Sequence, residues 1–145
     1  MASCTFFGHR KIPREIVLKI RDILIDLITN QNVDVFYVGN NGEFDQTVIS
    51  ELDYLSKAFS FSFSVVLAYM PTSKDNCFYK NSILPEGIEK VPRRFAIVYR
   101  NNWMLKQSDY VITYVENPIG SNAAKFKKLA IKRKKKVIEL YSYSL

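Results

Sequence analysis

The amino-acid sequence predicts an α/β fold, a three-layer sandwich of about five mostly parallel strands with helices on both faces. Short apolar runs rich in β-branched and aromatic residues alternate with longer segments of helical periodicity. Four of the five glycines lie just after such runs, where a parallel sheet meets its helices: Gly8, Gly39, Gly42 and Gly120. The length of 145 residues suits one core, so we expect a single domain over residues 1–145.

The chain opens with a strand, a helix and a second strand. The first apolar run includes Cys4 and ends at Gly8. Residues 14–31 repeat apolar side chains at i, i+4, i+7 and i+8, which predicts a helix with one broad apolar stripe. Residues 33–38 have the β-branched and aromatic content of a strand.

The middle of the chain continues this alternation and then loses it. Residues 44–59 carry apolar side chains at helical spacing, and residues 63–69 form a third strand that ends before Pro71. Residues 71–92 show no sustained periodicity, so we expect a loop. A loop of this length in a compact domain more often has a function or is mobile than merely connects two elements, and we interpret it as a candidate lid.

The last third of the chain returns to alternating elements. We expect a helix over residues 93–107, a strand over 110–115, a turn around Gly120, a helix over 122–134 and a strand over 136–140. Right-handed crossovers between these strands would complete a sheet with helices on both faces.

Composition restricts the class of protein. Hydrophobic residues make up 48% of the chain, but no stretch approaches the roughly 18 apolar residues that cross a bilayer, so we expect a soluble protein without membrane partners. The N-terminus lacks the features of a cleavable signal, and we expect a cytoplasmic location. Cys4 and Cys77 lack the spacing and company of a metal site, so we predict free thiols, no metal and no cofactor.

The turn after the first strand is suited to an anion. Gly8 lets the backbone approach a ligand, and Arg10 can form two hydrogen bonds to a phosphate or carboxylate. Arg10 would lie at a helix N-terminus, a poor place for a cation unless an anion is bound there. His9, the only histidine, can contact the ligand or hydrogen-bond the backbone of the turn.

Four further residues have two interpretations each. Asp45 either fixes the second turn or accepts a hydrogen bond from a ribose hydroxyl or from Arg10. Arg100 and Asn101 form either an exposed helix face or, as we favour, part of a pocket. Glu116 follows the fourth strand and is the one carboxylate we consider as an acid or base, although a structural role is preferred.

Five sequence blocks follow one another in order over nearly the whole chain. One strand ends in Phe7-Gly8-His9-Arg10 and a second in Gly39-x-x-Gly42-x-Phe44-Asp45; Arg-Asn-Asn-Trp-Met at 100–104, Ser-Asp-Tyr-Val-Ile at 108–112 and a glycine turn before an Ala/Lys helix come next. Together they resemble the SLOG superfamily, most closely its stand-alone YspA/YpsA-related proteins. The resemblance implies a Rossmann-like fold and a pocket for a nucleotide or nucleotide derivative. Catalysis is not implied, because related domains include Lonely Guy phosphoribohydrolases, DNA-processing protein A and ligand-sensing modules of bacterial immunity.

One departure from that family bears on catalysis. Lonely Guy enzymes carry Pro-Gly-Gly-x-Gly-Thr-x-x-Glu, whereas residues 118–125 read Pro-Ile-Gly-Ser-Asn-Ala-Ala-Lys, with Lys125 near the position of the catalytic glutamate. Ser121 or Asn122 can still cap the helix, whose free amides attract an anion. We predict Glu116 as the candidate catalytic residue, and the predicted ligand-binding residues are Gly8, His9, Arg10, Gly39, Asn40, Gly42, Asp45, Arg100, Asn101, Glu116, Gly120, Ser121 and Asn122.

Residues 125–136 contribute eight cations to the net charge of +7. They form either a solvated helix face or a patch for nucleic acid or an acidic partner, the second being the less favoured interpretation. The leading functional hypothesis is binding of a nucleotide or nucleotide-derived ligand at the C-terminal edge of the sheet, by a sensor or sequestering protein. The alternatives are hydrolysis of a nucleoside 5'-monophosphate at its glycosidic bond and a DNA-associated accessory role. The sequence leaves open the ligand's identity and whether the protein forms a homo-oligomer.

Overall fold

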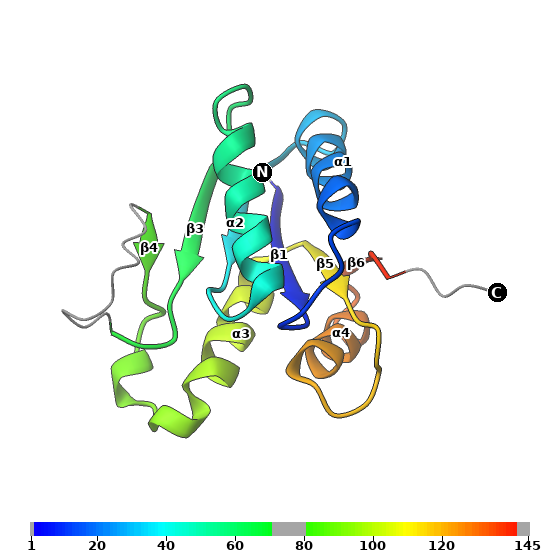
Figure 1. Cartoon of the computed structure of the whole chain (residues 1–145). Coiled ribbons are helices and arrows are strands. Elements are labelled where there is room, and N and C mark those ends of the chain that lie inside the picture. Colours follow the sequence, from blue (N-terminus) through cyan, green and yellow to red (C-terminus); the bar gives the residue numbers. More distant parts are fainter. Residues whose placement is uncertain (1, 71–80, 142–145) are drawn as a thin grey trace.

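The computed structural model describes residues 2–70 and 81–141 and confirms the predicted α/β class. Within this part of the chain one sheet of six strands is parallel throughout, in the order β4-β3-β2-β1-β5-β6 (Figure 1). The strands are β1 (Ala2–Gly8), β2 (Val33–Val38), β3 (Ser62–Val66), β4 (Ser82–Ile83), β5 (Tyr110–Tyr114) and β6 (Lys136–Glu139). The helices are α1 (Ile16–Thr29), α2 (Glu43–Leu55), α3 (Ala96–Gln107) and α4 (Asn122–Lys132), with short 3₁₀ helices at Ile88–Lys90 and Arg93–Phe95.

Two apolar clusters, one on each face of the sheet, make the sandwich. Phe6 points toward α1 and α2 and packs in a cluster with their apolar stripes, while the next residue, Phe7, packs with α3 and α4. This alternation follows from the two-residue period of a strand. The helix pairs α1–α2 and α3–α4 therefore cover opposite faces and form a Rossmann-like three-layer arrangement (Figure 1).

The sixth strand is the main departure from the predicted five. β4 pairs with the edge of β3, with Val65 opposite Ser82, and lies inside the segment predicted to be a loop. Two residues are too few to produce a recognisable apolar period, so the pairing has no sequence signal. Cys77 and the first ten residues of the candidate lid, 71–80, lie outside the described part of the chain, whereas the rest of the predicted loop contains β4 and the 3₁₀ helix Ile88–Lys90.

Two helix ends differ from the predicted bounds for backbone reasons. α1 begins at Ile16, so Arg10 lies well before its first turn and the argument that placed Arg10 at this helix N-terminus was wrong. α4 ends at Lys132 because Lys134 adopts a positive φ of 60°, which α-helical backbone does not permit.

The order of strands places the functional edge of the sheet. From β1 the chain adds β2 and β3 on one side and β5 and β6 on the other, so the order reverses between β1 and β5. Open parallel sheets bind ligands outside the carboxyl ends of the strands at such a reversal. None of the helices in the described residues is long and apolar enough to span a membrane.

Candidate functional site

A cavity of about 250 Å³ lies at the carboxyl ends of β1 and β5, at the reversal of strand order. Its walls come from the turn after β1, the first turns of α2 and α4, and one face of α3. The lining residues are Phe6, Phe7, Gly8, His9, Arg10, Asn41, Asp45, Ile97, Arg100, Asn101, Met104, Ser121, Asn122 and Ala123. The structure thus brings together eight of the predicted ligand-binding residues from four separate segments, and Ser121 and Asn122 are among them.

Arg100 is a buried cation on the wall of this cavity. The residue is only 2% exposed. Its Nη1 donates to Asn41 Oδ1 at 2.9 Å, Asn40 Oδ1 at 3.3 Å and the Val66 carbonyl at 3.3 Å, and its Nε donates to Asn101 Oδ1 at 3.0 Å. Nη2 has no partner among the described residues. The guanidinium of this cavity-lining residue therefore has a donor group available to an acceptor of the ligand.

Asp45 is the carboxylate of the same cavity. It is 9% exposed, and its Oδ2 accepts the backbone N–H of Asn41 at 2.9 Å. Oδ1 has no hydrogen-bond partner among the described residues. Burial raises the pKa of Asp45 from 3.8 to about 6, against the lowering effects of the Asn41 hydrogen bond and the charge of Arg100. Asp45 fixes the turn, as one of its two interpretations predicted, and as a lining residue of the cavity it also has an acceptor oxygen available.

Gly39 allows Arg100 and Asp45 to come together. A Cβ atom at this position would lie 3.0 Å from Cζ and Nη1 of Arg100 and 3.0 Å from Oδ2 of Asp45. Both charged side chains therefore pack over the bare backbone of the β2–α2 turn. Gly39 belongs to the site by supporting these two residues, and it is not part of the cavity lining.

His9 shows the structural role that the sequence left open. Its Nε2 accepts the backbone N–H of Glu116 at 2.9 Å and that of Asn117 at 3.3 Å. Because a backbone N–H only donates, Nε2 must be unprotonated and the proton of the neutral ring belongs on Nδ1. His9 thus ties the loop after β5 to the turn after β1. Its ring also lines the cavity, so a ligand contact by His9 stays a prediction.

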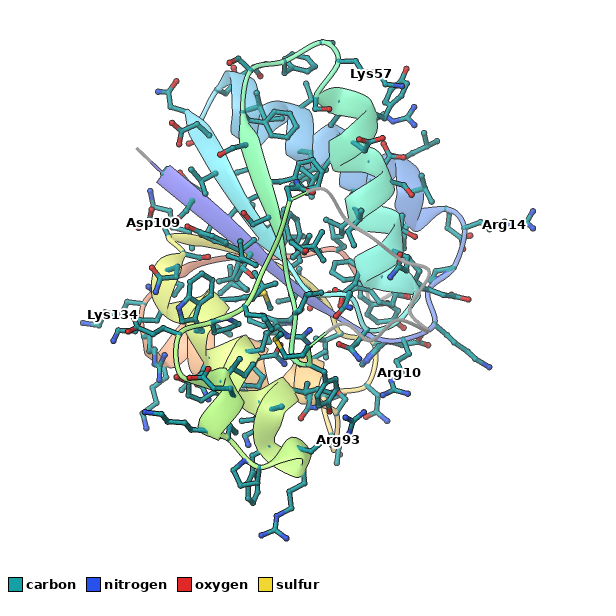
Figure 2. All side chains as sticks on the ribbon, turned by 90° about the vertical axis from the view of Figure 1, so that its left-hand side faces the viewer. Arg10, Arg14, Lys57, Arg93, Asp109 and Lys134 are labelled. Atoms are coloured by element: carbon teal, nitrogen blue, oxygen red, sulfur yellow. The ribbon has the colours of Figure 1, made fainter. Side chains whose placement is uncertain are left out.

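Arg10 is an exposed cation at the mouth of the cavity, beside the tip of β1 (Figure 2). Its backbone is fixed: its carbonyl accepts the N–H of Glu43 at 2.7 Å, and its Cα lies 2.8 Å from where a Cβ of Gly42 would be. Gly42, at φ 105°, is therefore needed for close packing of two turns and does not line the cavity. The Arg10 side chain forms no ion pair within the described residues.

The first turn of α4 supplies backbone donors. Ser121 caps the helix, its Oγ accepting the N–H of Ala124 at 3.1 Å, as the sequence predicted for this residue or its neighbour. The amides of Asn122 and Ala123 precede the first intrahelical hydrogen bond, and both residues line the cavity. Such unpaired amides and the helix dipole favour a negative group at this position.

Besides Gly39, Asn40 and Gly42, which do not line the cavity, two more predicted residues lie away from it. Glu116 is exposed and lines a separate shallow depression with His9, Lys11 and Gly120. Gly120 has φ 83° and open space around it. Glycine at this position permits the positive φ of the turn and is not needed for close packing. The carboxylate placed in the cavity is Asp45, which the sequence analysis did not consider as an acid or base.

Gly8 is required by the core. A Cβ at Gly8 would overlap the ring of Phe44, which packs directly against the end of β1. The residue lines the cavity, but the absence of a side chain is explained by Phe44 and not by ligand approach.

The sequence analysis missed Asn41 among the polar residues of the site. Its side chain accepts from Arg100 while its backbone N–H donates to Asp45. The signal was present in the run of turn-forming residues between Gly39 and Gly42, but no spacing rule distinguishes Asn41 from Asn40. Ile97 lies one helical turn before Arg100 and Met104 one turn after it, and both belong to the apolar part of the cavity lining.

Within residues 2–70 and 81–141 no group of three or more metal-ligating side chains could hold a metal ion. No model of a known protein family matches the chain, and no curated protein matches it. The resemblance to the SLOG superfamily therefore stays a prediction.

Proposed function

We propose that the protein binds a nucleotide or nucleotide-derived ligand in the cavity between β1 and β5, as a sensor or sequestering protein of the SLOG type. The observation that carries the proposal is the juxtaposition of Arg100 and Asp45, two buried and oppositely charged residues that line the cavity and that each have one polar atom without a partner among the described residues. Burying charged groups costs free energy, and packing of the hydrophobic core does not require them. A ligand that offers both acceptors and donors uses both groups.

The cavity has one wall suited to phosphate. Arg10, Arg100, Asn122 and Ala123 all line it, and together they offer two guanidinium groups and the first amides of α4. Charge-assisted hydrogen bonds from these donors are about twice as strong as neutral ones. Asp45, the opposite charge, accepts hydrogen bonds from hydroxyl groups, so it suits the ribose of a nucleotide.

The size of the cavity limits how much of the ligand is enclosed. Pockets for drug-sized ligands occupy roughly 300–1,000 Å³, and about 250 Å³ is slightly smaller. We expect the sugar and phosphate to be enclosed and the base to extend toward the open mouth. This arrangement favours recognition of the phosphoribosyl part over a particular base.

A second candidate is hydrolysis of the glycosidic bond of a nucleoside monophosphate, favoured by the buried carboxylate of Asp45. Its pKa of about 6 lets both the acid and the carboxylate be populated near neutral pH. Glu116 is outside the cavity, and Lys125 is an exposed residue of α4 that does not line it. If the protein turns over a nucleotide, Asp45 is therefore the acid or base.

The test is a thermal-shift screen of nucleoside monophosphates, cyclic nucleotides and ADP-ribose derivatives, each compared with its dephosphorylated analogue. A ligand at 100 times its Kd stabilises the fold by about 2.7 kcal/mol, which is readily measured. Chromatography of each hit then separates the two candidates: accumulation of free base over many turnovers, abolished by Asp45→Asn, establishes hydrolysis. Stabilisation without base release supports a binding protein, and the absence of any phosphorylated hit contradicts both.

A further inference from the structure

The outer surface of α4 and the turn into β6 is strongly cationic. Lys125, Lys128 and Lys132 are exposed at positions i, i+3 and i+7, which place them on one face of the helix. The turn that follows adds Arg133, Lys134 and Lys135, of which only Lys135 is partly buried. We call these six residues the basic stripe.

The positive charges of the basic stripe are not paired with acidic side chains of the described residues. The sequence contains no acidic residue between 117 and 138, and the one ion pair of this region joins Lys127, outside the stripe, to Glu139 at 2.7 Å. Lys136 Nζ lies 5.0 Å from the centre of the Tyr110 ring and is likewise outside the stripe. No ion pair involves a stripe residue within residues 2–70 and 81–141.

The helix itself does not explain these charges. Cations near the C-terminus of α4 are favoured by its dipole, but Lys125 lies near the N-terminus, where the dipole disfavours it. Like charges at i, i+3 and i, i+4 also destabilise a helix. The stripe therefore lowers the stability of the isolated protein, and an anionic partner would remove that cost.

The stripe begins at Lys125, close to the cavity, and extends away from it toward the opposite end of α4. In Figure 2 Lys134 lies near Asp109, on the side where the strands begin, whereas Arg10 lies beside the tip of β1. Since α4 starts at the cavity and runs away from it, only its first turn takes part in the nucleotide site. The two surfaces can thus be occupied at the same time.

We propose that the basic stripe binds the phosphate backbone of double-stranded nucleic acid without reading its sequence. The apolar face of α4, with Phe126 and Ala130 fully buried, is committed to the core and cannot insert into a membrane. Of residues 121–141, only Ile131 is a strongly exposed large hydrophobic side chain, at 57%. Among residues 121–141 no aromatic side chain is strongly exposed for stacking on unpaired bases, so recognition is through closely spaced phosphates.

The experiment measures fluorescence anisotropy of a labelled 20-base-pair DNA duplex over a salt series. Six phosphate contacts give a slope of log K against log salt of about −5, and loss of three contacts reduces it to about −3. The stripe variant is Lys128→Gln/Lys132→Gln/Arg133→Gln. The matched control, Arg14→Gln/Lys57→Gln/Lys90→Gln, removes the same three charges from exposed positions elsewhere, two of which Figure 2 labels far from Lys134.

We expect the stripe variant to bind the duplex about 100-fold more weakly than wild type at 0.1 M salt, and the control to stay within about threefold. We also expect the stripe variant to melt at a higher temperature than wild type in low salt, because repulsion is relieved. A variant that fails to fold would be recognised by the loss of this melting transition and by a changed circular dichroism spectrum.

Three results would overturn the proposal. The first is an equal loss of duplex binding in the stripe and control variants. The second is tighter binding to a 20-nucleotide single strand than to the duplex. The third is tighter binding to phosphatidylcholine vesicles containing phosphatidylserine than to the duplex at equal anionic charge. None of these outcomes depends on whether the cavity binds a nucleotide.

Discussion

Replacing Asp45 by asparagine should make the unliganded protein more stable at neutral pH. The pKa of Asp45 is about 6 in the folded protein and 3.8 as its ordinary value, and burial is the main cause of the difference. The folded state therefore resists ionisation of this carboxyl, and the unfolded chain does not. At 1.36 kcal/mol per pKa unit, the difference corresponds to about 3 kcal/mol of stability lost once the group is ionised in both states.

The pH dependence of this effect has a definite sign. Below pH 3.8 the carboxyl is protonated in both states and the penalty is absent. Between pH 3.8 and about 6 the unfolded chain releases its proton first, so stability falls as pH rises, and above about pH 6 the penalty is constant. Asparagine does not ionise and its Oδ1 can still accept the N–H of Asn41, so the variant lacks the penalty at every pH.

Urea denaturation at pH 4 and pH 7.5 measures the effect. We expect Asp45→Asn to exceed wild type by about 3 kcal/mol at pH 7.5 and by less than about 1 kcal/mol at pH 4. Asp53→Asn, an exposed position of the same helix, is the control and should change stability little at either pH. A variant less stable than wild type at pH 7.5, or a gain that does not vary with pH, would show that Asp45 is not a buried charge in this structure.

Three further predictions address the turns around the cavity. Arg10→Ala should weaken the binding of a phosphorylated ligand by about 1.5–3 kcal/mol, roughly 10- to 150-fold, and leave the binding of its dephosphorylated analogue unchanged, as measured by calorimetry. Arg14→Ala is the control. Equal losses of affinity for both ligands would show that Arg10 does not recognise the phosphate. Gly8→Ala should lower the free energy of unfolding by about 1–3 kcal/mol, because the added Cβ clashes with Phe44. Gly120→Asn should be nearly neutral, because asparagine tolerates positive φ and the space around Gly120 is open. If chemical denaturation showed the larger loss for Gly120→Asn, the packing assigned to Gly8 would be contradicted. Glu116→Gln should leave nucleotide affinity within about twofold because the carboxylate lies outside the cavity, and a large loss measured by calorimetry would restore Glu116 to the site.

The class of fold could be predicted from the sequence because its signals are local. The apolar stripe of α1 and the β-branched run of β2 each repeat long enough to show their period. β4 could not be found, since it is a two-residue strand defined by its pairing with Val65 and not by its own pattern. Helix α1 was predicted two residues too early because the apolar pattern does not record where the backbone closes its first turn.

The site could be predicted as a set of turns, but not as a set of contacts. Gly8 was interpreted as a place for ligand approach, and the structure shows that Phe44, from a helix more than thirty residues later, requires it. Glu116 was preferred to Asp45 as a carboxylate because it directly follows a strand. Burial determines which of the two carboxylates belongs to the cavity. The burial of Asp45 depends on how α3 packs Arg100 over the β2–α2 turn, and a local sequence pattern does not contain this long-range contact.

The most direct test of the central claim is a nuclear magnetic resonance titration of ¹⁵N-labelled protein with the nucleotide that gives the largest thermal shift. The proposed site predicts that amide signals move in three separate segments, around Gly8–Arg10, Asn41 and Ser121–Ala123, and that they do not move in residues 128–136. Arg10→Ala should reduce these shifts at equal nucleotide concentration. Shifts confined to the basic stripe, or spread without preference over the surface, would contradict a nucleotide site between β1 and β5.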